Sequence, residues 1–350
     1  MARSKVLWAR AGVIAAATVP ASLAAGIAYS ATAIDHALPL SPAIEAEQRV
    51  LRSPAAGKLS YYADEQPSGR PLLLVHSINA AASAYEMRPL FERYRGKRPV
   101  YAPDLPGFGF SERSDRAYSP ELYTAALRDL LLELTAGREA ADIVALSLGC
   151  EFASRVALQQ PERVRSLTLI SPTGLTARAR GNRPERTTAG EPGDALYQAF
   201  RFPLWSQAFY DMLASRPSIR YFLRKSFVGE PDRGLVAYAY TTAHQPGARF
   251  APLAFVSGRL FTPDIRESVY EQLPMPTLAL YDEDAFVRFD TLPDVLARNP
   301  RWQAIRLVPS KGLPQFERLD ETTRALDAFW QEIGAGRAEA DPRLPSRRVP

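Results

Sequence analysis

Cysteine and histidine are both scarce in this chain of 350 residues, and their scarcity excludes several kinds of site. Cysteine occurs once, at Cys150, so the chain can form no internal disulfide and no cysteine-rich metal site. Histidine occurs three times, at His36, His76 and His244. The sequence therefore implies no metal and no organic cofactor, and it offers few candidates for a histidine base.

A basic stripe is also missing. The 43 Lys and Arg residues and the 38 Asp and Glu residues are mixed along the chain and give a formal charge of +5. Without basic residues interleaved with aromatic ones, nucleic acid is not an expected partner. With 46% apolar and 23% charged residues, the chain is long enough for one large globular core, or for one core with an insertion.

A long uncharged run lies near the amino terminus. Three basic residues precede the uncharged residues 11–34. This pattern predicts a signal peptide or an N-terminal transmembrane helix over residues 1–34, with the main domain on the extracytoplasmic side of the membrane. The run could cross a bilayer core of about 30 Å, whereas Ala31-Thr32-Ala33 resembles a cleavage site, so both alternatives stand. Residues 35–53 are expected to form a linker.

Short apolar segments alternate with helical patterns from residue 54 onward. This alternation predicts a mostly parallel central sheet flanked by helices, with right-handed crossover connections. An edge strand is expected at residues 59–63, and buried strands are expected at residues 72–75, 100–103, 143–146, 167–170, 277–281 and 302–308.

The alternation stops over residues 173–273, a segment too long for a simple loop. Helical patterns near residues 194–214 and 219–227 predict a helical insertion over the sheet. Its aromatic residues are candidates for the wall of an apolar pocket or for the core of the insertion itself. They are Tyr197, Phe200, Phe202, Trp205, Phe209 and Tyr210. The main domain is expected over residues 54–335, followed by a disordered tail over residues 336–350.

The sequence around Ser147 predicts a strand, a sharp turn and a helix. It reads A-L-S-L-G over residues 145–149, one residue away from the pattern G-x-S-x-G. Small residues let the strand and the helix pass close together. At such a turn the amide of Leu148 and the helix dipole face any negative charge on a bound carbonyl oxygen. A buried turn with an incidental serine is the alternative interpretation.

Three motifs in the same order resemble those of the α/β-hydrolase family. They are Val75-His76-Ser77, the sequence D-L-P-G-F-G-F-S over residues 104–111, and the turn at Ser147. The resemblance covers residues 54–333 and places the helical insertion where the family carries its cap. It therefore implies an α/β-hydrolase fold with a helical cap.

The resemblance also implies roles for individual residues. Ser147 would be the nucleophile, and the amides of Ile78 and Leu148 would form the oxyanion hole, with Ser77 beside them as a further substrate contact. An acid is expected after the strand at residues 277–281. Asp284 is the first candidate for this acid, and Asp282 is the fallback. His76 belongs to the strand before the oxyanion turn and is expected to be structural.

The histidine that the family uses as a base is absent. The sequence K-G-L-P-Q-F-E over residues 311–317 retains the surrounding motif, but Gly312 stands at the histidine position. A serine hydroxyl without a base is a poor nucleophile. Three alternatives stay open: His244 could fold over Ser147, Lys311 could act as a desolvated amine base, or the protein could bind a ligand without hydrolysing it.

Two functions follow from these observations. The first is a serine esterase or lipase-like hydrolase of small apolar esters. The alternative is a catalytically impaired relative that binds a small apolar ligand or acts as a scaffold. The missing histidine separates the two, and the membrane is an expected partner through the N-terminal segment.

The N-terminal pattern makes a prediction about topology. A reporter fused after Pro350 should be exported, because the basic flank stays in the cytoplasm while the bulk of the chain crosses the membrane. Alkaline phosphatase and green fluorescent protein fusions measure this, since the first is active only outside the cytoplasm. A fluorescent, phosphatase-negative result would contradict the predicted orientation.

Overall fold

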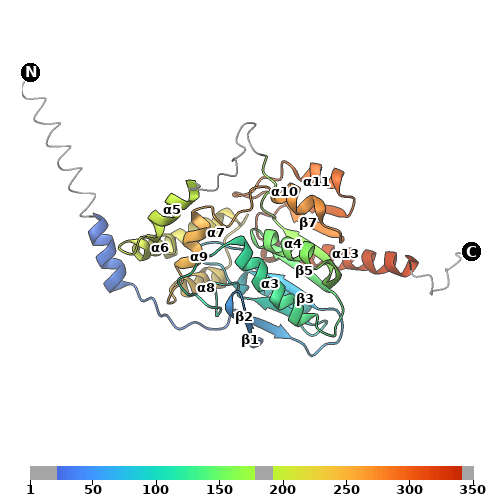
Figure 1. Cartoon of the computed structure of the whole chain (residues 1–350), viewed down its shortest axis with the longest axis horizontal. Helices are drawn as coiled ribbons and strands as arrows, with labels where there is room; N and C mark the ends of the chain where they lie inside the picture. Colours follow the sequence, from blue (N-terminus) through green and yellow to red (C-terminus); the bar gives the residue numbers. More distant parts are fainter. Residues whose placement is uncertain (1–21, 178–191, 341–350) are drawn as a thin grey trace, which may run out of the picture.

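A computed structural model describes residues 22–177 and 192–340, and in this part of the chain eight strands form one sheet. The strand order is β1-β2-β4-β3-β5-β6-β7-β8, with helices packed around the sheet (Figure 1). Strand β2 runs antiparallel to β1 and β4, and the other neighbouring strands are parallel. The predicted mostly parallel sheet is therefore confirmed.

The central strands are short and buried on both faces, as the continuous apolar segments predict. Successive residues of a strand face opposite sides of the sheet, so Leu73 joins one core cluster while Leu72 and Leu74 join the other. The strands are β1 (Glu47–Ser53), β2 (Gly57–Asp64), β3 (Leu72–Val75), β4 (Val100–Pro103), β5 (Ala141–Leu146), β6 (Val164–Ile170), β7 (Thr277–Tyr281) and β8 (Trp302–Arg306).

Helices cover both faces of the sheet. On one face lie α3 (Pro120–Leu134), α4 (Gly149–Gln159) and α11 (Leu292–Arg298). On the other face lie α2 (Arg88–Tyr94), preceded by η1 (Ala84–Met87), and α13 (Leu319–Ala340), preceded by α12 (Pro314–Glu317). Short η2 (Pro161–Arg163) leads into β6. Helix α3 begins at Pro120, and Ser119 caps it by accepting from Leu122 N.

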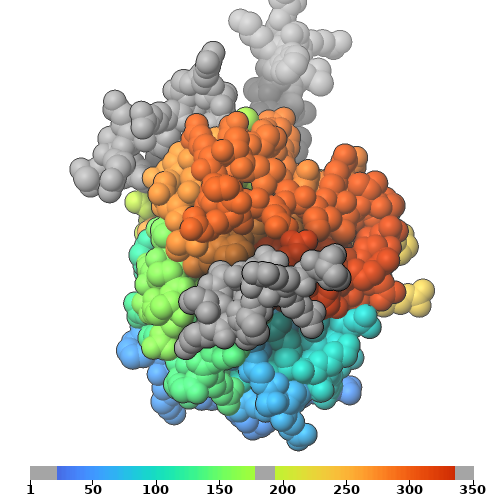
Figure 2. All heavy atoms as spheres, turned by 90° about the vertical axis from the view of Figure 1, so that its right-hand side faces the viewer, coloured from blue at the N-terminus to red at the C-terminus, as the bar shows by residue number. Residues whose placement is uncertain are grey.

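The insertion between β6 and β7 is helical, as predicted. Its helices are α5 (Pro192–Arg201), α6 (Ser206–Leu213), α7 (Arg216–Lys225), α8 (Arg233–Ala243), α9 (Phe250–Val256), α10 (Ile265–Ser268) and η3 (Tyr270–Gln272). Helices α5 to α9 form a cap at one side of the sheet, on the left in Figure 1. Figure 2 shows the other side of the molecule, where the last third of the chain, in orange, packs above blue and green segments of the first half.

The N-terminal segment contacts the cap. Residues 22–33 form a helix beside α6 (Figure 1), and Ser30 Oγ donates a hydrogen bond of 2.5 Å to Asp211 Oδ2. Within residues 22–177 and 192–340, no helix combines the length and the apolar character needed to span a bilayer. Residues 1–21, the larger part of the predicted signal peptide or anchor, lie outside the described residues.

The structure differs from two of the predicted boundaries. Residues 47–53, expected within a linker, form the edge strand β1, whose mostly polar and exposed side chains conceal it in the sequence. Residues 59–63, expected as the edge strand, therefore lie in β2, between β1 and β4. Helix α13 contains Gly334 and Gly336 and runs to Ala340, past residue 335, where the main domain was expected to end. A glycine within a helix costs only about 1 kcal/mol relative to alanine. Residues 341–350 of the expected tail lie outside the described part of the chain.

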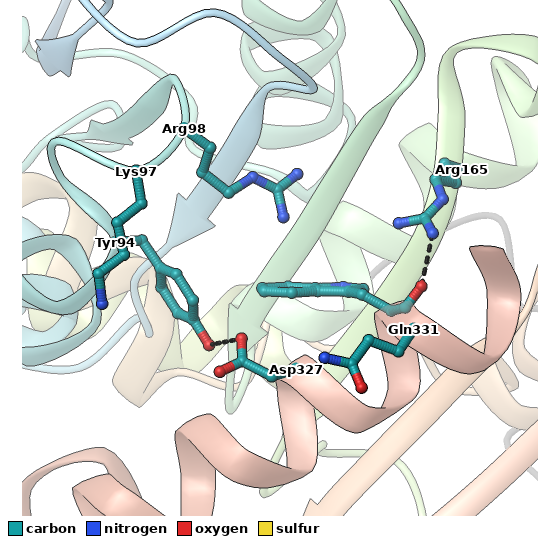
Figure 3. Close-up of a pocket in the computed structure, with 7 residues that line it drawn as sticks. Tyr94, Lys97, Arg98, Arg165, Asp327 and Gln331 are labelled. Carbon is teal, nitrogen blue, oxygen red and sulfur yellow. Dashed lines mark hydrogen bonds between the residues drawn. The ribbon is translucent and has the colours of Figure 1, made fainter. Parts of the chain in front are cut away.

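A buried charge cluster joins the amino-terminal ends of the central strands. Asp142 in β5 is fully buried and accepts from Arg98 Nη2 at 2.6 Å and from Arg165 Nη1 at 3.2 Å. Arg98 also lies over the ring of Trp330 in α13, and Arg165 donates to the Trp330 carbonyl oxygen. Figure 3 shows Arg98 and Arg165 above α13, with Tyr94 bonded to Asp327 of the same helix. The cluster therefore fixes α13 against the sheet.

We predict that Asp142→Asn lowers the free energy of unfolding by about 3 kcal/mol, because it leaves buried arginines without a full counter-charge. Urea unfolding measures the change. Glu121→Gln is the matched control, since Glu121 pairs with Arg155 at 3.1 Å while its side chain stays 73% exposed. Loss of this exposed pair should cost under about 1 kcal/mol. Equal effects of the two variants would contradict the structural role of the buried cluster.

Candidate active site

Ser147 lies in the sharp turn between β5 and α4. Its backbone φ is 51°, in the left-handed region that costs a non-glycine residue about 1 to 2 kcal/mol. Two backbone hydrogen bonds hold the turn: Ser147 N donates to Ile170 O at 2.8 Å, and Cys150 N donates to Ser147 O at 3.0 Å. A strained, well-held serine at a strand-to-helix turn is the geometry of a nucleophile elbow.

Close packing explains the small residues around Ser147. A Cβ atom on Gly149 would lie 2.3 Å from the carbonyl oxygen of His76, at the end of β3, so a side chain there would displace the backbone. Cys150 is fully buried, and its Sγ lies 3.2 Å from the carbonyl oxygen of Ala145. The elbow is therefore pressed against the turn that follows β3.

The amides of Ile78 and Leu148 are available to a ligand. Both residues line one cavity of about 430 Å³ together with Ser147. Within the described residues, neither amide donates a hydrogen bond. Leu148 is also the N-cap residue of α4, so the positive end of that helix dipole faces the same point. The Ser77 residue lines the cavity too, but its amide donates to Glu86 Oε2 at 2.8 Å.

His76 is structural, as expected. It is completely buried, and its Nε2 accepts a hydrogen bond of 2.9 Å from Leu105 N. The proton is therefore on Nδ1, which donates to the carbonyl oxygen of Ser77. Burial lowers the pKa of His76 to about 4, so the ring is neutral at physiological pH and neither nitrogen is free to act as a base.

The structure distinguishes the two candidate acids. Asp282 is 7% exposed, and its oxygens accept from Arg306 Nε and Ser310 N, both at 2.8 Å. Asp284 lines the cavity with Ser147. Its Oδ1 accepts from the amides of Phe286 and Val287, and burial raises the pKa of its carboxyl group above the ordinary value.

Gly312 lies next to the second carboxylate oxygen of Asp284, Oδ2. A Cβ on Gly312 would be 2.9 Å from Asp284 Oδ2, and Gly312 lines the cavity with Asp284 and Ser147. The φ angle of Gly312 is outside the left-handed region, so its backbone accepts other residues. The loop that lacks the histidine is therefore in the place that the sequence motif predicts.

Neither alternative base lines the cavity. His244 ends α8, is 1% exposed, and has its Nδ1 2.7 Å from the carbonyl oxygen of Tyr240. Its ring stacks near His36, which pairs with Asp211 of the cap. Lys311 is the neighbour of Gly312, but it is not among the residues around the cavity. The structure therefore does not bring His244 or Lys311 to Ser147.

The cap supplies an apolar wall, but not with the residues expected. Of the described cap residues, α7, α8 and α9 contribute Ile219, Phe222, Leu223, Leu235, Ala239, Phe255 and Val256. The six aromatic residues expected from the sequence, Tyr197 to Tyr210, do not line the cavity. Phe200 packs against Phe209 and Phe202 against Trp205, and the Tyr210 hydroxyl donates to the Ala80 carbonyl oxygen. Aromatic residues at helical spacing can line a pocket or pack inside the cap, so the sequence alone could not decide which they do.

Two polar residues of the cavity had no sequence signal. Glu86 in η1 is 4% exposed, and its Oε1 accepts from Asn79 Nδ2 at 2.8 Å. Burial raises the pKa of this carboxyl group. Asn79 also donates to Ser77 Oγ at 2.9 Å. A single acid at the start of a helix has no characteristic pattern, and only the fold brings it beneath the oxyanion turn.

Comparisons with known proteins agree with this architecture. The model of the Alpha/beta hydrolase family matches residues 72–325, which is more than half of the chain. A segment of 111 residues is 33% identical to 2-hydroxymuconate semialdehyde hydrolase of Pseudomonas sp. (strain CF600), covering 31% of this chain and 38% of that protein. A segment of 107 residues is 39% identical to an esterase of Mycobacterium tuberculosis, covering 29% of this chain and 35% of that protein. Each match thus spans less than half of the relative.

A solved structure extends the likeness to the whole fold. The crystal structure of a serine hydrolase involved in carbazole degradation superposes with a TM-score of 0.63. The superposition covers 81% of this chain and 98% of that chain at 16% sequence identity, so it concerns the fold alone. Because the family model covers residues 72–325 and the sheet, elbow and cap have the matching arrangement, the chain belongs to the α/β-hydrolase family.

Proposed function

We propose that this protein is a serine hydrolase of small apolar esters, with Ser147 as the nucleophile. The observation that carries the proposal is the left-handed turn at Ser147, which opens into an apolar cavity beside two amides that donate to no other described residue. Strained backbone of this kind persists where the surrounding structure enforces it, and it commonly serves a site.

Each group around the cavity has a part in the proposed reaction. Ser147 Oγ attacks the ester carbonyl carbon as its proton passes to solvent water, and the oxyanion that forms accepts from the amides of Ile78 and Leu148. Collapse of this intermediate breaks the ester C–O bond and releases the alcohol, and water then hydrolyses the acyl-enzyme to the acid. Asp284 is the acid, because its Oδ2 faces Gly312, whereas Asp282 is engaged with Arg306 and Ser310. No side chain at position 312 takes the serine proton, so the intrinsic turnover is low.

The size and lining of the cavity support small apolar substrates. A volume of about 430 Å³ lies within the range of small-molecule sites, which is roughly 300 to 1,000 Å³. Most of its lining is aliphatic or aromatic. The name of the mycobacterial relative, an esterase, supports ester hydrolysis as the reaction class. The basic flank and uncharged run of residues 1–34 support export of the domain, by a signal peptide or with a retained anchor.

The second candidate is a protein that binds a small apolar ligand without turning it over. One observation favours it: all three histidines of the chain lie among the described residues, and none lines the cavity. His36 pairs with Asp211, while His76 and His244 are bonded as described above. The two candidates differ in whether Ser147 is activated, so kinetics can separate them.

We predict that Gly312→His increases the hydrolysis of a short activated ester severalfold or more. The imidazole would receive the Ser147 proton and donate its other N–H to Asp284 Oδ2, and positioned general bases contribute up to about 10⁴-fold. The Cβ contact with Asp284 is with the end of a flexible side chain, which can move by a few tenths of an ångström. Initial rates with p-nitrophenyl acetate and labelling by a fluorophosphonate measure the gain.

Three comparisons make this experiment specific. Gly312→Ala adds a methyl group without a base and should leave the rate near that of the wild type. Ser147→Ala in the Gly312→His background should remove the gain. The gain should also disappear as the pH falls below the imidazole pKa, because only the neutral ring accepts a proton. Rapid turnover by the wild type that depends on Ser147 would contradict a missing base.

A further inference from the structure

The cavity has an unusual charge composition. Among the described residues that line it, the charged side chains are Glu86 and Asp284, and no lysine, arginine or histidine is present. The chain as a whole carries a formal charge of +5. The negative character of this cavity is therefore local, and it belongs to two carboxyl groups set in apolar walls.

Neither carboxyl group has a cationic partner in the described part of the chain. Glu86 accepts from the Ser77 amide and from Asn79, and Asp284 Oδ1 accepts from two amides. By contrast, the buried Asp142 and Asp282 each pair with arginine. Glu86 is buried and Asp284 is half-buried, and the costly desolvation of a carboxylate without a counter-ion raises the pKa of both groups. A bound cation would relieve this cost.

One oxygen is placed to receive such a cation. Asp284 Oδ2 accepts no hydrogen bond from the described residues, and it faces the space beside Gly312, which has no side chain. The aromatic residues Phe222, Phe255, Phe261 and Phe286 also line the cavity. Aromatic rings can bury an apolar body, and their faces attract a positive charge.

We propose that the cavity binds small apolar amines, with the ammonium group at Asp284 Oδ2 beside Gly312 and the apolar body against the aromatic wall. Glu86 adds a second negative charge without direct contact being required. This inference deepens the proposed function, on which it rests for the cavity, by naming the substrate class as apolar esters that carry an amine. Binding and hydrolysis are separate measurements, so either can fail alone.

Isothermal titration of the full chain at pH 7.5 tests the proposal with three probes of one size: phenylpropylamine, phenylpropanol and phenylpropanoate. The amine should bind on the order of tenfold more tightly than the alcohol, as expected for one charge-assisted hydrogen bond. The carboxylate should bind more weakly than the alcohol. Affinity for the amine should rise with pH as Asp284 ionises, and fall when the amine loses its proton near pH 10.

Variants locate the charge that gives this selectivity. Asp284→Asn should bring the amine and the alcohol to equal affinity, and Glu86→Gln should reduce the difference. Glu283→Gln is the matched control, because Glu283 is exposed on the same loop and does not line the cavity. Gly312→His should weaken amine binding by filling the space at Asp284 Oδ2, which also tests the position should Asp284→Asn fail to fold.

Equal affinity of the wild type for amine and alcohol would overturn the proposal, as would amine selectivity that survives Asp284→Asn or is unaffected by Gly312→His. Amine selectivity together with a Gly312→His variant that stays inactive on esters would uphold the amine site and remove the serine hydrolase. If Gly312→His gains ester hydrolysis but the wild type shows no selectivity for the amine, the serine hydrolase is supported and the amine site is ruled out.

Discussion

The contact between the His76 carbonyl oxygen and Gly149 is the constraint on which the site depends. It brings the turn after β3 against the start of α4, where even a methyl group would meet the oxygen at 2.3 Å. The first turn presents the Ile78 amide, and the second presents Ser147 and the Leu148 amide. This close approach of two backbones therefore brings together the amides of the proposed oxyanion site, and the buried ring of His76 holds the turn after β3 by accepting from Leu105 N while donating to Ser77 O.

The loop that contains Gly312 is fixed at both ends by hydrogen bonds to two acidic side chains. Asp282 ties the end of β7 to Arg306 in β8 and to the Ser310 amide, and thereby fixes the start of the loop that contains Gly312. Glu317 fixes its other end, because it accepts from the Lys311 amide and from the Val228 amide of the cap. These bonds hold the loop around Gly312 in place without any contribution from a side chain at position 312.

The sequence predicts those parts of the fold that follow from local pattern. Apolar segments predicted β3 to β7, because each signal lies within a few residues. Residues 302–308 were expected to form a buried strand, but β8 is mostly exposed. Strand β1 was missed because its polar side chains face solvent. The elbow was found from its small residues, but the choice between Asp284 and Asp282 needed Arg306, which is remote in sequence. Glu86 and the cap residues that face the cavity could not be predicted, because only tertiary packing decides which helix face lines a site.

Two different groups can fill the space beside Asp284 Oδ2: a histidine side chain at position 312 or the proposed ammonium ligand. In the family pattern an imidazole stands between the serine and the acid, and it neutralises the buried acid whenever it holds a proton. Here Asp284 is half-buried with a raised pKa, and beside Gly312 its Oδ2 accepts no hydrogen bond from the described residues. The ammonium group of a ligand can therefore form the ion pair with Asp284 that a protonated histidine would form. A histidine at position 312 and an ammonium ligand at Asp284 would exclude each other, so the glycine that leaves the proposed nucleophile without a base is the same residue that leaves space for the proposed cation site.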